Sequence, residues 1–177
     1  MLNYRKNVLK NKHQETLRSP IIPAKKIKIL TLDMVLEINE KIKLRAVRDS
    51  RIEYRGSEDY PVKAQKLKKL IDSVPSRDVL EIAAYYLKNI ILLQAFPDAN
   101  HRTALTATKI FLEMNSYEFS YTPDEAYRFQ TDCYNKRMQI YKTYEEMPTS
   151  VLKEEDNTLF SLCLEFIKNH LSLTSTS

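Results

Sequence analysis

The sequence predicts an all-α fold, from its glycine content, its hydrophobic spacing and its helix caps. Gly56 is the only glycine in 177 residues, whereas glycine averages roughly 7% of residues in proteins. Strand-rich folds with tight hairpins use glycine for positive φ angles. Apolar residues instead recur at helical spacing in several stretches. The length suits one well-filled core and is short for two ordinary domains, so we expect a single globular unit.

Charge divides the chain into a basic arm, residues 1–28, and a folded domain, residues 29–177. Residues 1–28 carry a net charge of +7, because they contain eight lysines and arginines and one acidic residue, Glu15. The whole chain has a net charge of +5, so the residues after Lys28 carry −2. A basic arm can contact nucleic acid or an acidic partner. We interpret it mainly as a flexible, solvated leader, and nucleic-acid binding through it as the less favoured alternative.

Location and redox state are predicted from the cysteines and from the apolar runs. Cys133 and Cys163 lack the CxxC spacing of a zinc or redox site, and no secretory leader is recognisable. The longest apolar run falls short of the ~20 residues that span a bilayer. We therefore expect a reduced, cytoplasmic protein with no membrane segment.

The first half of the folded domain contains four predicted helices. The first begins near Thr31 and places Met34 or Val35, Ile38 and Ile42 on one face, with Leu44 as a further candidate. Residues 49–62 break the periodicity and predict an exposed loop or small hairpin. The remaining three helices are predicted from Val62 to Pro75, from about Arg77 to Phe96 after a Ser76 cap, and from about Ala99 to Asn115. The helix from about Arg77 to Phe96 is apolar nearly all round, which is typical of a central helix.

The second half is predicted to hold two more amphipathic helices. Residues 117–121 make a brief extended link, and Thr122, Pro123 and Glu125 then form a capping-box helix start with proline at the first helical position. Helical patterns cover residues 126–144 and 157–171. We expect the last residues, LTSTS, to fray.

A polar cluster, QAFPDANHRTAL at residues 94–105, joins the two most apolar helices. Backbone N–H groups at a helix start have no intrahelical acceptor and lie at the positive end of the helix dipole, so they bind anions. Arg102 adds a charged fork for phosphate oxygens and Asn100 adds an amide donor. Asp98 can cap the helix or hold Mg²⁺ together with phosphate.

The residues FxDANxRTAL, from Phe96 to Leu105, resemble the signature of the Fic/Doc family and most closely its Doc branch, the death-on-curing toxins. FLEMNSYEF, residues 111–119, also resembles the end of that family's motif helix, with serine in place of glycine. The resemblance covers roughly residues 31–130. It implies the all-α Fic fold, a bundle of about six to eight helices with a short flap loop or hairpin.

The resemblance also implies a chemistry and a role for each matched position. Asp98 would be the Mg²⁺ ligand, Asn100 and Arg102 would bind phosphate, and the backbone amides of residues 99–102, starting at Ala99, would form the anion hole. Family members transfer AMP, or in Doc-type proteins a phosphate, from ATP or another nucleoside triphosphate to a hydroxyl of a target protein. The target would dock in extended form at the flap, residues 49–62.

Three departures from the family pattern concern the chemistry. Gln94 stands where the family has its catalytic histidine, and an amide cannot usefully accept a proton at neutral pH. His101 replaces glycine or lysine. We expect it near the phosphates or exposed in the first turn, on the opposite side of the loop from Gln94. Leu105 replaces a second arginine that is frequent in AMP-transferring members, which favours the Doc side.

Two hypotheses about function follow. The first is an enzyme of Fic/Doc type whose catalysis is weakened by Gln94, and the second is a catalytically inactive nucleotide- or protein-binding module. The nearest approach to the family's self-inhibitory motif, Ser150 to Glu155, ends in the wrong residue. Any inhibition would then come from another chain, as with an antitoxin.

Overall fold

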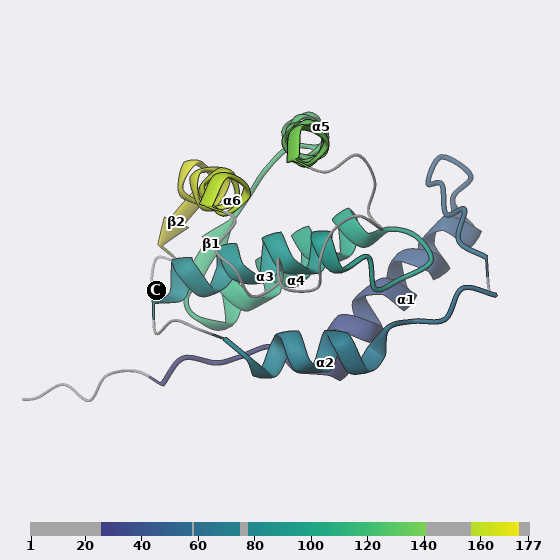
Figure 1. Ribbon diagram of the computed structural model, residues 1–177, viewed down its shortest axis with the longest axis horizontal. Helices are drawn as coiled ribbons and strands as arrows, with labels where there is room; N and C mark the ends of the chain where they lie inside the picture. The colour runs from purple at the N-terminus through teal and green to yellow at the C-terminus, as the bar shows by residue number, and fades with distance from the viewer. Residues whose placement is uncertain (1–25, 58, 75–77, 141–156, 174–177) are drawn as a thin grey trace, which may run out of the picture.

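The computed structural model describes residues 26–57, 59–74, 78–140 and 157–173 (Figure 1). The described part is mostly helical, with a single pair of short strands, so the predicted all-α fold is confirmed. The helices are α1 Leu32–Arg48, α2 Ala64–Asp72, α3 Val79–Leu93, α4 Asn100–Met114, α5 Pro123–Ile140 and α6 Asn157–Asn169. The strands are β1 Tyr117–Phe119 and β2 Leu171–Leu173. No helix of the described ranges is long and apolar enough to cross a membrane.

Helices α3 and α4 lie side by side at the centre of the molecule (Figure 1). Helix α1 packs on α4 and α2 packs on α3, whereas α6 covers α3 and α5 packs on α6. Most of α3 is buried, as its sequence predicts for a central helix. Tyr86 of α3 and Phe111 of α4 are fully buried and meet edge to face, with ring centroids 5.2 Å apart. Such a pair adds roughly 1 kcal/mol to the burial of its rings.

The helix starts explain where the predicted boundaries hold and where they fail. The Thr31 side chain caps α1 by accepting the Met34 N–H at 3.3 Å, which confirms the predicted start. Helix α3 is capped by Asp78, and the predicted cap at Ser76 is therefore wrong. The Asp78 carboxylate accepts two orphan N–H groups of the first turn, which shortens the helix at its start.

The predicted capping box of α5 is present. The Thr122 N–H donates to the Glu125 carboxylate at 2.7 Å, and the Glu125 N–H donates to the Thr122 hydroxyl at 3.3 Å. The Glu125 carboxylate also lies 3.4 Å from Nε2 of His170, whose ring packs at a tilt against Phe166. The His170 side chain is only 18% exposed.

The small sheet corrects one further expectation. Strand β1 pairs antiparallel with β2, with Glu118 opposite Ser172. Leu173 is therefore in a strand and not in a frayed end. Leu44, a further candidate for the buried face of α1, is 46% exposed. His13, Ser150–Glu155 and most of the basic arm lie outside the described residues.

Candidate functional site

The side chain of Asn100 ties the link between α3 and α4 to itself. Its Oδ1 accepts the Phe96 N–H at 3.0 Å and its Nδ2 donates to the Phe96 carbonyl at 2.9 Å, and both residues are buried. Gln94 and Ala99 flank this closed loop in left-handed conformations, with φ of 46° and 61°. Each such non-glycine residue costs roughly 1 kcal/mol, and such strain clusters at functional sites.

Helix α4 begins without a capping side chain. Its N-cap is Ala99, and the first backbone bond of the helix joins the Thr103 N–H to the Ala99 carbonyl at 2.8 Å. Within the described ranges, the N–H groups of residues 100–102 have no hydrogen-bond acceptor. These three donors and the helix dipole make a site for an anion. The Asn100 side chain, by contrast, is engaged by Phe96 and directs neither polar atom to a ligand.

Asp98 and Arg102 lie together at this helix start, with Nη2 of Arg102 4.0 Å from Oδ1 of Asp98. The Asp98 carboxylate accepts the Ala99 N–H and, at 2.5 Å, the N–H of Arg55 in the 49–62 loop. Arg102 donates to the carbonyl of Glu53 in the same loop at 2.7 Å. Both side chains are about one-third exposed, so a ligand in solution can reach them.

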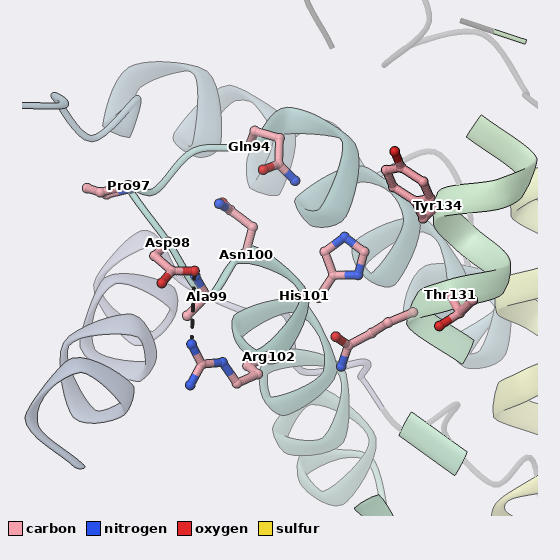
Figure 2. Close-up of a pocket in the computed structure, with 10 residues that line it drawn as sticks. Gln94, Pro97, Asp98, Ala99, Asn100, His101, Arg102, Thr131 and Tyr134 are labelled. Atoms are coloured by element: carbon pink, nitrogen blue, oxygen red, sulfur yellow. Dashed lines mark hydrogen bonds and ion pairs between the residues drawn. The ribbon is translucent and has the colours of Figure 1, made fainter. Parts of the chain in front are cut away.

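A cavity of about 480 Å³ opens above the α4 N-terminus (Figure 2). It brings together every site residue expected from the sequence: Gln94, Asp98, Ala99, Asn100, His101 and Arg102. Its opposite wall is formed by Gln130, Thr131 and Tyr134 of α5, which the sequence did not indicate as site residues. Their spacing puts them on one helix face, but only the packing of α5 shows that this face looks onto the motif.

Gln94 and His101 line the same cavity, Gln94 from the end of α3 and His101 from the first turn of α4 (Figure 2). The antiparallel arrangement of α3 and α4 turns both side chains inward. The Gln94 Nε2 donates to the Ile91 carbonyl at 2.7 Å and so closes the end of its own helix. The Gln94 amide oxygen takes no part in this bond and can accept a hydrogen bond at the cavity wall.

His101 is a neutral side chain at ordinary pH. Burial lowers the pKa of its imidazole to about 4, and the positive charge of Arg137 lowers it further in the same direction. Its Nδ1 is buried and has no hydrogen-bond partner within the described residues. A neutral imidazole has one donor and one acceptor nitrogen, so His101 can hydrogen-bond to a phosphate without adding charge.

The lowered pKa of His101 predicts a stability change in acid. The imidazole takes up a proton more readily in the unfolded chain, near pH 6.5, than in the folded one. Its contribution is therefore complete above pH 6.5 and is lost as the pH falls toward 4. We expect the free energy of unfolding to drop by on the order of 3 kcal/mol across that window. Urea titrations of the His101→Gln variant should show a smaller drop, and an equal drop in both proteins would contradict the assignment.

A second cavity, of about 590 Å³, lies on the other side of the motif. The 49–62 loop lines it with Arg51 and Arg55, and it meets the first cavity at Asp98 and Arg102. These two charged side chains thus stand between two cavities. One cavity faces α5 and the other faces the loop, so two different molecules can approach the same pair of groups.

Asn39 of α1 holds the α3–α4 link and the start of α4 through hydrogen bonds, a role that the sequence did not indicate. Its buried amide donates to the Asp98 carbonyl at 3.1 Å and to the Thr103 hydroxyl at 2.9 Å. It also accepts the Tyr54 hydroxyl at 3.3 Å. A polar residue on the buried face of an amphipathic helix was the available signal. Asn39 fixes α1, the loop and the start of α4 relative to one another.

The helical fold and this loop define a class of protein: an α-helical domain in which the start of a central helix has no side-chain cap and faces a cavity. Comparison with protein families is consistent with this class. Residues 29–112 match the model of the Fic/DOC family. Searches of curated proteins and of solved structures gave no match. The matched segment runs from the start of α1 almost to the end of α4 and includes the whole 94–102 loop.

Proposed function

We propose that this protein binds a Mg²⁺–nucleoside triphosphate, with ATP as the expected nucleotide, and transfers AMP or phosphate to a hydroxyl of a target protein. The observation that supports this most is the uncapped start of α4, where free N–H groups stand beside Asp98 and Arg102 in one cavity. The triphosphate would lie along these N–H groups, with the guanidinium of Arg102 on its oxygens. His101 would add a hydrogen bond to the phosphates.

Mg²⁺ fits the residues at hand. This ion keeps several water ligands and needs only one or two carboxylates when a nucleotide supplies phosphate oxygens. Asp98 offers such a carboxylate, and no cluster of three or more His, Cys, Asp or Glu side chains forms a closed metal cage among the described residues. When bound, the ion would supply positive charge for the phosphates. The remaining work falls to this chain's own groups, which bind and orient the nucleotide.

The transferred group is proposed to be a phosphate, as in the Doc branch. Leu105 stands where AMP-transferring members often have a second arginine, and it is only 3% exposed. An apolar side chain packed into the core provides no further contact to a nucleotide. In the reaction, the target's hydroxyl oxygen forms a bond to phosphorus, the bond from that phosphorus to its leaving oxygen breaks, and the hydroxyl proton must be accepted by a base.

Gln94 favours a second candidate function, that of a binding module without turnover. An amide at that position can orient a hydroxyl through its oxygen but cannot take its proton. The target protein is proposed to dock at the 49–62 flap, and an antitoxin-like inhibitor remains a proposed partner. Nucleic-acid binding by the basic arm is a less favoured proposal.

Nucleotide binding is tested directly by replacing Arg102. We expect the Arg102→Gln variant to bind ATP with Mg²⁺ at least tenfold more weakly, because hydrogen bonds to charged groups contribute about 1.5 to 3 kcal/mol. Isothermal titration calorimetry of both proteins measures this. The Arg128→Gln variant removes an exposed arginine of α5 that lines no described cavity, and should bind as the unmodified protein does. No measurable binding by the unmodified protein would exclude the proposed function.

A further inference from the structure

The flap strand, a name used here for residues 52–56 although they pair with no strand of the described residues, lies directly on the two ionic groups of the site, Asp98 and Arg102. The N–H of Arg55 donates to Oδ2 of Asp98, and the carbonyl of Glu53 accepts from Nη2 of Arg102. The contacts come from the backbone, one donor meeting the carboxylate and one acceptor meeting the guanidinium. The Asp98 carboxylate therefore accepts a hydrogen bond, and the Arg102 guanidinium donates one, before any ligand binds.

Side-chain packing holds the flap strand in this position. Exposure alternates along it, with Glu53 and Arg55 exposed and Ile52, Tyr54 and Gly56 less so. Tyr54 bonds to Asn39 of α1. Gly56 passes so close to Pro97 that a Cβ atom there would meet the Pro97 Cβ at 2.6 Å. The single glycine of the chain thus stands where the flap strand crosses the motif loop.

We propose that the flap strand is a latch that competes with the nucleotide for the site. This inference rests on the proposed function. A metal ion on Asp98 competes with the Arg55 N–H for the carboxylate, and phosphate oxygens compete with the Glu53 carbonyl for Arg102. Binding of the Mg²⁺–nucleotide therefore releases the flap strand.

Release has a consequence for the order of binding. Residues two apart in an extended strand direct their backbone groups to the same side. The Glu53 carbonyl and the Arg55 N–H, once freed, form one edge that can pair with an extended peptide. The latched flap strand has this edge occupied by Asp98 and Arg102. Nucleotide binding thus precedes and enables the pairing of a target segment along that edge.

The test begins with the unmodified full-length protein. Calorimetry establishes whether ATP with Mg²⁺ binds, and amide hydrogen exchange followed by NMR reports on the Arg55 N–H with and without saturating nucleotide. We expect exchange at Arg55 to become at least tenfold faster when the nucleotide binds, because the bond to Asp98 is lost. The Val35 amide, in the buried part of α1, is the internal control and should not change.

A pair of variants tests the same competition through binding affinity alone, without hydrogen-exchange data. Arg55→Pro removes the backbone donor, whereas Arg55→Ala removes the side chain and keeps the donor. We expect Arg55→Pro to bind ATP with Mg²⁺ about tenfold more tightly than Arg55→Ala, because both variants lack the arginine side chain and only Arg55→Pro also lacks the backbone donor.

The outcomes separate the latch from the proposed function. Absence of binding by the unmodified protein would exclude both. Binding with unchanged exchange at Arg55 would overturn the latch alone, even if Arg55→Pro failed to fold. Equal affinities of folded Arg55→Pro and Arg55→Ala for ATP with Mg²⁺ would also overturn the latch alone. Faster exchange together with tighter binding by Arg55→Pro would establish it.

Discussion

The Gln94→His variant is expected to modify a target protein ~10² to 10⁴ times faster than the unmodified protein, which is the usual contribution of a general base. Gln94 lines the cavity that the uncapped start of α4 faces, so a histidine there would be near the phosphates. The backbone permits the change, because histidine is among the residues that tolerate a positive φ. The variant loses the bond to the Ile91 carbonyl, which costs roughly 1 kcal/mol of stability.

The measurement is transfer of label from γ-³²P-ATP and, in parallel, α-³²P-ATP to proteins of a cell lysate. Label from the γ-position indicates phosphate transfer, and label from the α-position indicates AMP transfer. Gln94→Asn is the matched control, because it keeps an amide and should show no gain. Labelling by the unmodified protein at the rate of the variant would show that Gln94 does not limit the reaction. Nucleotide binding without labelling by either protein would support the binding module.

The Asn100→Ala variant is expected to lose about 2 to 4 kcal/mol of stability and, with it, nucleotide binding. The substitution leaves the N–H and the carbonyl of Phe96 buried without partners, and each unsatisfied group costs about 1 to 3 kcal/mol. Water can relieve part of this cost, which is why we expect less than the full sum. The α3–α4 link would no longer hold Asp98 and the α4 amides in register.

Urea denaturation measures the stability of this variant, and calorimetry measures its affinity for ATP. Asn135→Ala changes an exposed asparagine of α5 and should alter stability by less than about 0.5 kcal/mol. Asn100→Asp keeps the acceptor for the Phe96 N–H but faces the Phe96 carbonyl with a carboxylate, so it should also be destabilised. A stable Asn100→Ala protein with unchanged affinity would show that Asn100 does not organise the loop.

Most of the fold could be predicted from the sequence because its signals are local. The apolar spacing of α3 predicted a central helix, and Thr122 with Glu125 predicted the start of α5. The cap of α3 was misplaced because two candidate residues, Ser76 and Asp78, stand close together. Strand β2 was missed because three residues of strand exist only by pairing with β1, more than 50 residues earlier in the chain.

The candidate site was predictable to the extent that it is contiguous. Residues 94–102 line one cavity, yet the contributions of Asn39, Tyr54 and the α5 wall depend on packing between distant segments. The direction of a side chain was also beyond the sequence. Asn100 was expected to contact phosphate, but its amide turns back to Phe96, and this use of both its polar atoms is visible only in three dimensions.

The uncapped start of α4 implies a trade between stability and binding. A serine, threonine or aspartate side chain that capped this helix would stabilise it by about 1 kcal/mol, but it would do so by occupying the N–H groups that a ligand needs. Ala99 has no atom that can compete. Selection for thermal stability alone would therefore favour a capped start of α4, and the protein would become more stable while its site closed.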